Sequence, residues 1–322
     1  MTTDYKSIIL QNLKAIKLQE QKNKDAFKVR AYNKAIKSIE EYHDAIPSYE
    51  ALVAAKLDGL GKGILTKIEE IIKNGYLERT KEALVNTEKS KAIEMFSSIM
   101  AVGPVKADVL VNTHNILTIE NLRKNAHLLN EKQQLGLEYY EDFLKRIPRK
   151  EMGSHSELLC RVISQVAPDA TFDIAGSYRR GAADSGDIDV LFTLPKNHPN
   201  AADTFQEVVT ALKKEKYLRA NFAFGPEKYM GVAKLPRHRT ARRIDLMYIP
   251  SEKYPFALLY FTGSQAFNIR MRQHALSKGL SLSEHGFKDL KTNKFVSMPE
   301  LTSERSVFEF LQMDWVSPVD RK

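Results

Sequence analysis

The sequence predicts a multidomain α+β protein whose first half is helical and whose second half mixes helices with short strands. Three observations carry this prediction: helical spacing of apolar residues over positions 5–45, two similar glycine turns between helical patterns, and alternating strand patterns from about residue 170 onward. With 322 residues, the chain is long enough for two or three domains that each bury a core.

The composition excludes several classes of protein. The chain is 43% hydrophobic and 28% charged, and it has no apolar run of about 18 residues, so we expect no membrane role. Its first residues, MTTDYKSIIL, lack the features of a secretory signal. The single cysteine, Cys160, is typical of a reducing, intracellular compartment. Because neither Cys160 nor the eight histidines show metal-ligand spacing, a zinc site is not expected.

The formal net charge is +9, and the basic excess is spread along the chain rather than gathered in one tail. A distributed excess suits a protein whose successive modules contact a polyanion, because each phosphate contact releases counterions and adds affinity. An ordinary basic protein has the same balance of charges. Charge alone therefore leaves nucleic-acid binding and this simpler interpretation about equally open.

The first third is predicted to be helical, with two glycine turns. Residues 57–64 and 100–107 resemble each other when Gly61 is superposed on Gly103. The first N–H groups of a helix after such a turn lack partners and can bind a phosphate oxygen. One copy alone is more often a plain helix corner, but two copies in a basic chain favour helix-hairpin-helix motifs that hold a DNA backbone. The apolar residues at helical spacing are Ile8, Leu13, Ile16, Leu18, Ala31, Ala35, Ile36 and Ile39.

From about residue 170 the pattern changes to strands. Pro148, within a basic segment, is a candidate hinge between the two halves. Beyond Pro255 the sequence predicts one further helix at 264–278, with a few short strands and turns. Strands are expected at 171–175, 187–193, 229–235 and 243–249, with a helix at 204–214.

Two aspartates, Asp187 and Asp189, stand two residues apart in the second predicted strand. Residues two apart share a face of a strand, so the two carboxylates repel each other unless a divalent cation lies between them. In the strand at 243–249, alternation places Asp245 on one face with Arg243. A third carboxylate would complete a two-metal site for an in-line displacement, with Mg²⁺ as the natural ion.

The segment just before these aspartates offers groups that bind anions. Gly176 and Ser177 end a strand, and the turn after them presents backbone N–H groups together with Arg179 and Arg180. Taken alone, an Asp-x-Asp pair near a glycine turn is more often a turn-capping feature. The combination of Gly-Ser, Asp-x-Asp and a distant strand aspartate is more specific, and it predicts a phosphate cradle that faces a metal site.

Residues 176–191, 242–245 and the Tyr-Phe-Thr-Gly-Ser run at 260–264 resemble the signatures of family X DNA polymerases. The resemblance covers nearly the whole chain; the layout is similar to the beta type of that family, and residues 278–285 are similar to the lambda type. It implies four parts: a helical 5′-deoxyribose phosphate lyase-like domain (1–85), a helical duplex-binding subdomain (86–148), a palm (149–250), and a C-terminal subdomain that binds the nascent base pair (251–322).

The resemblance also implies roles for individual residues. Asp187, Asp189 and Asp245 would bind two Mg²⁺ ions, which Mn²⁺ can replace, and Asp245 would receive the proton of the primer 3′-hydroxyl. Glu284 would help to seat the closing C-terminal subdomain. The incoming nucleotide would be bound by Arg146, Gly176, Ser177, Arg180, Gly186, Tyr260, Phe261, Gly263 and Asn268. DNA would be bound by Lys28, Lys34, Gly59, Gly61, Arg79, Gly103, Val105, Lys106, Arg243 and Arg272, with Na⁺ or K⁺ at the hairpin turns.

A second active site is implied in the helical first third, where Lys67 stands at the place of the family's Schiff-base lysine. That chemistry needs a neutral amine, and crowding by cations such as Lys28, Lys34 and Arg79 favours one. A lysine after a glycine turn is otherwise usually a solvated helix residue.

The sequence departs from the beta-type pattern at several positions. An arginine of the beta type is replaced by Met247, which bears on an inactive form of the site. An aspartate and a lysine are replaced by Gln265 and Ile269, which bears on base-pair discrimination. Gly63 replaces a phosphate-binding lysine, and Phe27 replaces a histidine, although a Phe ring can still stack on a base. The last two changes imply a weaker lyase.

Two other functions stay open on the sequence alone. A poly(A) or CCA-adding nucleotidyltransferase shares Gly-Ser and Asp-x-Asp but should lack the hairpin repeats, and a DNA-binding protein without catalysis should lack one of the three aspartates. As a family X polymerase, the protein would act as a monomer on gapped or primed duplex DNA with dNTPs. The implied setting is base excision repair in the nucleus, together with other repair proteins.

Overall fold

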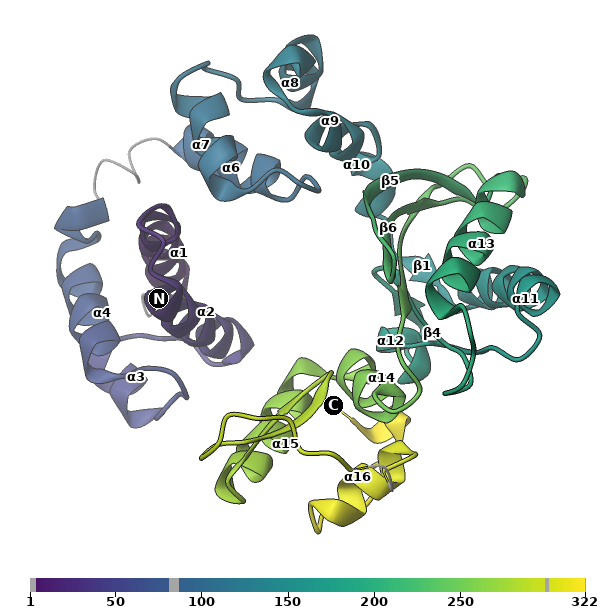
Figure 1. Ribbon diagram of the computed structural model, residues 1–322. Helices are drawn as coiled ribbons and strands as arrows, with labels where there is room; N and C mark the ends of the chain where they lie inside the picture. Colours follow the sequence, from purple (N-terminus) through teal and green to yellow (C-terminus); the bar gives the residue numbers. More distant parts are fainter. Residues whose placement is uncertain (1–3, 81–86, 299–300, 322) are drawn as a thin grey trace. The chain divides into compact units, whose positions relative to one another are not determined.

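The computed structural model describes residues 4–80, 87–298 and 301–321. The chain forms two compact units, Met1–Glu138 and Tyr139–Lys322, each with cores of its own (Figure 1). The boundary expected between residues 85 and 86 falls outside the described residues. Within the described ranges, no helix has both the length and the apolar character needed to cross a bilayer.

The first unit is entirely helical in its described parts, as the sequence predicted. Residues such as Ile9, Leu13 and Ile39 are buried because they repeat on one face of each helix. Its helices are α1 (Lys6–Lys22), α2 (Ala26–Glu41), α3 (Tyr49–Ala54), α4 (Lys62–Asn74), η1 (Glu78–Thr80), α6 (Thr87–Ser97), α7 (Pro104–Asn112), α8 (Ile119–Lys124), η2 (Ala126–Leu128) and α9 (Glu131–Glu138).

The two copies of the predicted internal repeat, at Gly61 and Gly103, also share the same backbone geometry. Gly61 and Gly103 are the N-cap residues of α4 and α7, and each carbonyl accepts a hydrogen bond from the N–H four residues later, at 3.0 Å. Two residues earlier in each copy, Gly59 (φ +84°) and Ala101 (φ +67°) adopt positive φ. A Cβ atom on Gly61 or Gly103 would meet nothing within 4 Å, so both turns open to solvent.

The second unit is built on a five-stranded mixed sheet with strand order β2-β4-β7-β6-β5. Strands β4 and β7 are parallel, and the other pairs are antiparallel. Helices α11 and α13 pack on one side of this sheet (Figure 1). The elements are α10 (Tyr140–Phe143), β1 (Ile147–Pro148), α11 (Arg149–Val166), β2 (Thr171–Ile174), α12 (Gly176–Arg179), β3 (Asp184–Ser185), β4 (Ile188–Thr193), α13 (Ala201–Lys214), β5 (Leu218–Phe224), β6 (Lys228–Ala233) and β7 (Arg242–Tyr248).

The C-terminal part of the second unit has a separate apolar cluster that includes Phe256, Phe267, Phe287 and Phe308. Helix α15 matches the helix predicted at 264–278, and Ser264 caps it by accepting a hydrogen bond from the Phe267 N–H. The elements here are α14 (Tyr254–Thr262), α15 (Gln265–Ser277), β8 (Leu280–Ser283), β9 (Gly286–Asp289), α16 (Glu304–Phe310) and η3 (Pro318–Asp320).

A buried ion pair fixes the first residue of β7. Arg242 donates to both carboxylate oxygens of Glu151 on α11, at 2.7 and 2.8 Å, and to the Lys145 carbonyl at 2.8 Å. Glu151 also lies 3.6 Å from the fully buried His155, whose Nδ1 is 2.8 Å from the Tyr217 hydroxyl. Burial lowers the pKa of His155 to about 4, so this imidazole is neutral at pH 7.

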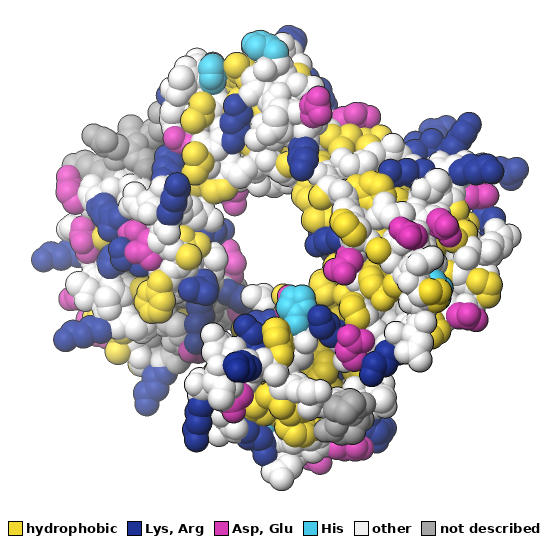
Figure 2. All heavy atoms as spheres, in the orientation of Figure 1, with side chains coloured by type: hydrophobic (Ala, Val, Ile, Leu, Met, Phe, Trp, Pro, Cys, Tyr) yellow, Lys and Arg dark blue, Asp and Glu magenta, His cyan; other side chains and the backbone are white. Residues whose placement is uncertain are grey.

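The surface agrees with the charge pattern of the sequence. Figure 2 shows Lys and Arg side chains on the visible faces of both units, mixed with Asp and Glu. Pro148, the candidate hinge, pairs with Asp184 through strands β1 and β3 inside the second unit.

Candidate active site

Two of the three predicted carboxylates meet at the centre of the sheet. Asp189 of β4 and Asp245 of β7 are direct register partners, because these two strands pair in parallel. Side chains at paired positions of neighbouring strands lie on the same face, so the two carboxylates stand next to each other. The fold therefore brings together two residues 56 positions apart in the sequence.

The electrostatics of this pair are unfavourable without a cation. Burial, and then the charge of Asp245, raise the pKa of Asp189 to about 6 against the opposing effect of Lys228 and Arg180. Burial also raises the pKa of Asp245. The Oδ1 atom of Asp245 is buried and has no hydrogen-bond partner. An unpartnered carboxylate oxygen beside a second carboxylate fits a divalent cation with oxygen ligands.

The third aspartate, Asp187, is engaged differently. Its carboxylate forms an ion pair with Arg243 of β7, the residue two positions before Asp245. No three His, Cys, Asp or Glu side chains of the described residues form a single metal-binding cluster. Binding of a cation by all three aspartates therefore requires Arg243 to release Asp187.

Gly176 allows the turn that it forms with Ser177 to approach the carboxylate of Asp189. Its φ is +57°, and a Cβ atom there would lie 2.9 Å from Oδ2 of Asp189. No real Cβ contact is that short, so a side chain at this position would displace the carboxylate as well as strain the backbone. Both the backbone conformation and the available space therefore favour glycine at this position.

Three residues expected to bind the nucleotide surround strand β3. Ser177 lies 3.0 Å from the Ser185 hydroxyl, and Arg146 makes two bonds to Asp184, at 2.7 and 2.9 Å. A Cβ atom on Gly186 would lie 3.0 Å from Arg146 Nη1. Arg146, Ser177 and Gly186 are therefore neighbours, although the arginine precedes the other two by at least 31 residues.

The remaining predicted nucleotide-binding residues gather around α14. Arg180 donates to the Thr262 carbonyl at 2.6 Å and lies beside Gly263. Asn268 donates to the Tyr260 carbonyl at 2.7 Å, and the Arg272 guanidinium lies 5.1 Å from the centre of the Tyr260 ring. The Phe261 ring packs edge-on against Tyr260.

A buried network of charges joins α12 to the end of the chain. Glu304 of α16 accepts bonds from Arg179, at 2.6 and 3.1 Å, and from Arg321, at 2.6 Å. Arg179 also donates to the Thr262 hydroxyl at 2.8 Å. Arg321 is fully buried, and its guanidinium lies 5.1 Å from the centre of the Trp315 ring. This network holds Arg179, the residue before Arg180, in place.

In the first unit, three cations of the expected lyase site form ion pairs. Lys28 and Arg79 both pair with the buried carboxylate of Glu20, and Lys34 pairs with Asp58. Lys67, on α4, donates to the Gly63 carbonyl at 2.9 Å. Val105 and Lys106 occupy the first turn of α7, directly after Gly103.

The positions that depart from the beta-type pattern have distinct surroundings. Met247 is buried in an apolar cluster with Ala175, Leu191 and Ala257. Ile269 is exposed, and Phe27 is 77% exposed, which leaves its ring free to contact a ligand. Glu284 lies beside His285, 3.6 Å away, between β8 and β9.

Lys228 is the main site residue that sequence reasoning missed. It lies in β6, the neighbour of β7, and its charge lowers the pKa values of both Asp189 and Asp245 against the larger effect of burial. The strand prediction began one residue later, at Tyr229. Only the pairing of β6 with β7 reveals that this lysine faces the aspartates.

The Asp189→Asn substitution is expected to stabilise the protein by about 1–3 kcal/mol at pH 7.5 in the presence of a chelator. The pKa of Asp189 rises from 3.8 to about 6 on folding, and each pKa unit corresponds to about 1.4 kcal/mol. The folded state binds the proton of Asp189 more tightly than the unfolded state does. Asp189 therefore contributes its full stabilisation below about pH 4, and this contribution is lost as the pH rises through about 6.

The measurement is urea unfolding at about pH 4.5 and pH 7.5, with the exposed Asp169→Asn substitution as the control. The gain for Asp189→Asn should appear at the higher pH and shrink at the lower one. A loss of stability at pH 7.5 would contradict the assignment of repulsion to this pair.

Comparison with known protein families gives four matches in order along the chain. Residues 6–77 match the model of a helix-hairpin-helix domain, and residues 94–144 match the fingers domain of DNA polymerase lambda. Residues 146–251 match the DNA polymerase beta palm, and residues 257–322 match the DNA polymerase beta thumb. The sheet with the paired aspartates is thus a palm.

Individual relatives agree with these matches. DNA polymerase lambda of Arabidopsis thaliana is 33% identical over 310 residues, and that of Rattus norvegicus is 31% identical over 337 residues, covering 90% and 99% of this chain. DNA nucleotidylexotransferase of Xenopus laevis is 27% identical over 82% of the chain. The chain spans 56–58% of the length of these three relatives.

The chain belongs to family X of the DNA polymerases. This membership removes the poly(A) and CCA-adding alternative, since the hairpin and thumb parts are both present.

Proposed function

We propose that the protein is a DNA-directed DNA polymerase that fills short gaps by adding a deoxynucleotide to a primer 3′-hydroxyl. The observation that supports this best is the pairing of Asp189 with Asp245 in a family X palm, where Asp245 Oδ1 has no partner. The substrates would be gapped duplex DNA and dNTPs. The names of the relatives, DNA polymerase lambda, agree with this class of reaction.

In this reaction, the primer 3′-oxygen attacks the α-phosphorus of the triphosphate, a new phosphorus–oxygen bond forms, and pyrophosphate leaves. Two Mg²⁺ ions held by Asp187, Asp189 and Asp245 would stabilise charge on the attacking and leaving oxygens. Asp245 would accept the proton of the 3′-hydroxyl, since burial raises its pKa and makes it a better base. Release of Asp187 would free Arg243 to bind a DNA phosphate.

The residues of the cradle would orient the triphosphate. Ser177 and Arg146 present a hydroxyl and a guanidinium at β3, and Arg180 presents a second guanidinium beside Gly263. Guanidinium groups suit phosphate oxygens because they donate paired, charge-assisted hydrogen bonds. Arg146 would exchange Asp184 for the nucleotide.

The test is extension of a primer across a one-nucleotide gap, with Mg²⁺ and the dNTP that matches the template. The wild-type protein should incorporate one nucleotide and should prefer the matched dNTP over the other three. Failure to extend this substrate would leave the non-catalytic DNA-binding function as the better description.

We also propose a 5′-deoxyribose phosphate lyase activity that depends on Lys67, which lies in the second turn of α4, the helix that follows the first hairpin turn. The Lys67→Ala substitution is expected to reduce borohydride trapping of the imine by about 10²-fold or more, because no other amine would replace the nucleophile. The measurement is trapping on a gap that bears a 5′-deoxyribose phosphate.

The control is Lys73→Ala, which removes a lysine from the last turn of the same helix. Gap filling should be unchanged in both variants. Equal trapping by wild type and Lys67→Ala would remove the lyase assignment while leaving the polymerase proposal intact.

The wider setting follows the same proposal. A gap-filling enzyme with a lyase would serve base excision repair as a monomer in the nucleus, together with other repair proteins. The two open hairpin turns, at Gly61 and Gly103, would hold the DNA backbone, with Na⁺ or K⁺ between turn and phosphate.

A further inference from the structure

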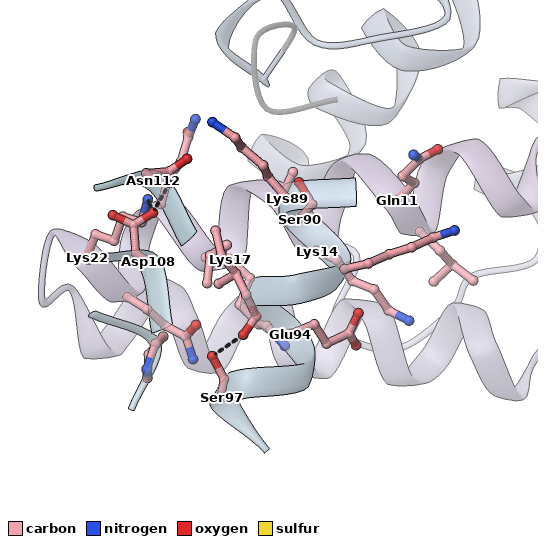
Figure 3. A pocket seen from close by; sticks show the side chains of 18 of the residues that line it. Gln11, Lys14, Lys17, Lys22, Lys89, Ser90, Glu94, Ser97, Asp108 and Asn112 are labelled. Carbon is pink, nitrogen blue, oxygen red and sulfur yellow. Dashed lines mark hydrogen bonds and ion pairs between the residues drawn. The ribbon is translucent and has the colours of Figure 1, made fainter. Parts of the chain in front are cut away.

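The first unit contains two helical modules, residues 4–80 and residues 87–138, which meet at a loosely packed joint. Separate family models match residues 6–77 and 94–144. The buried cluster that includes Ile9, Ile39 and Leu77 draws all of its members from the first module. A cleft of about 1080 Å³ lies between α1 of the first module and α6 and α7 of the second (Figure 3). We refer to it as the α1–α6–α7 cleft.

The α1–α6–α7 cleft keeps apolar side chains of the two modules from packing together. Leu10 and Leu18 of α1 line one wall, and Ile93 of α6 lines the other. An open space between two walls forfeits the dispersion contacts of a packed core. Lysines on both walls also repel each other: Lys14 and Lys17 on α1, and Lys89 and Lys91 on α6. Apolar packing across the cleft therefore contributes little to holding the modules together.

An ion pair joins the two walls of the cleft. Lys22, in the last turn of α1, pairs with the Oδ1 atom of Asp108 on α7. Asn112, one turn further along α7, donates to the same oxygen at 2.7 Å. Figure 3 shows these three side chains together. The Lys22 and Asp108 side chains are 38% and 25% exposed, so dissolved salt can screen the attraction between them.

We propose that Lys22 and Asp108 form a salt-sensitive clasp that holds the first module against the second. Because little packing spans the cleft, the loss of this one pair allows the modules to separate. The hairpin turns at Gly61 and Gly103 belong to different modules, so the clasp fixes the separation between them. A solvent-accessible ion pair shifts such an equilibrium by about 1.4- to 5-fold, which is small enough for the ionic strength to reverse.

The clasp has a consequence for gap length that rests on the proposed gap-filling function. Two turns at a fixed separation suit one spacing between the DNA backbone segments that they hold. Each further nucleotide in a gap moves these segments apart by up to about 3.4 Å along the strand. The closed clasp should therefore favour short gaps, and its opening should make longer gaps relatively better substrates.

The experiment measures the distance between spin labels on the two modules by pulsed electron paramagnetic resonance. The labels are attached to full-length protein through Lys73→Cys and Lys132→Cys, at exposed positions, with the natural cysteine removed by Cys160→Ser. Wild type should show one dominant distance at about 0.05 M salt and a growing fraction of longer distances at about 0.5 M.

Charge reversal tests the pair itself. Lys22→Glu should raise the fraction of longer distances at low salt by about fivefold or more, because repulsion replaces attraction. Lys22→Glu combined with Asp108→Lys should restore the wild-type distances. The matched control is Lys37→Glu, since Lys37 pairs with Glu41 of its own helix, and it should leave the distances unchanged. Wild-type distances in Lys22→Glu, or no restoration by the double reversal, would overturn the clasp.

Extension across a one-nucleotide gap and a five-nucleotide gap separates this inference from the polymerase proposal. The ratio of long-gap to short-gap filling should rise in Lys22→Glu and return to the wild-type value in the double reversal. Altered label distances with an unchanged ratio would overturn the effect on gap length. If wild type extends neither primer, the proposed function fails, while the label distances still decide whether the clasp exists.

Discussion

Replacing Asp245 with alanine is expected to reduce nucleotide incorporation by about 10³-fold or more, through kcat, with little change in the affinity for gapped DNA. The substitution removes a proposed cation ligand and the proton acceptor for the 3′-hydroxyl together. A general base alone contributes about 10²–10⁴-fold, and the charge stabilisation supplied by a bound cation adds several kcal/mol. The measurement is single-turnover extension across a one-nucleotide gap.

Loss of folding cannot explain this expected result. Asp245 stands next to Asp189, and burial disfavours both charges, so removing one of them relieves repulsion. The unfolding midpoint of Asp245→Ala in a chelator should equal or exceed that of wild type. Asp169→Ala, at an exposed position of the same unit, is the matched control and should extend primers normally. Extension by Asp245→Ala at the wild-type rate would rule out this carboxylate as the catalytic group.

Replacing Glu304 with alanine is expected to destabilise the second unit by about 3–5 kcal/mol. The substitution leaves the buried guanidinium of Arg321 and that of Arg179 without their shared carboxylate, and an unpaired buried charge carries a penalty of this size. Trp315, the one tryptophan of the chain, lies against Arg321. Its fluorescence during urea unfolding measures the stability of this part directly.

The control for Glu304→Ala is Glu309→Ala, an exposed glutamate on the same helix α16. It should change the unfolding free energy by no more than about 0.5 kcal/mol. If the two substitutions had equal effects, the network of Glu304 with Arg179 and Arg321 would contribute little to stability.

Local patterns in the sequence predicted much of the fold. The helix at 264–278 and the strand at 187–193 agree with α15 and β4 to within one residue at each end. Strand β5 was not predicted, because Arg219 and Asn221 interrupt its apolar character at the edge of the sheet. Helix α14 was missed because it is apolar on all sides and shows no periodicity.

The candidate site was predictable only in part, since it depends on strand pairing. Alternation indicated which side chains share a face of one strand, but not that β4 lies parallel to β7, which makes Asp189 and Asp245 partners. The ion pair of Asp187 with Arg243 and the position of Lys228 follow from the same pairing. Contacts of this kind have no local signal in the sequence, because they join residues far apart in the chain.

The register of β7 determines whether Asp189 and Asp245 are paired at the candidate site. Arg242 and Arg243 are adjacent, and only Arg242 reaches Glu151. A slip of one residue would turn every side chain of β7 to the opposite face, so that Arg243 would compete for Glu151 and Asp245 would point away from Asp189. A chain folded in that register could remain compact yet be inert. The Arg242–Glu151 ion pair thus distinguishes two registers of β7. In one register Asp189 and Asp245 are paired, and in the other they are not.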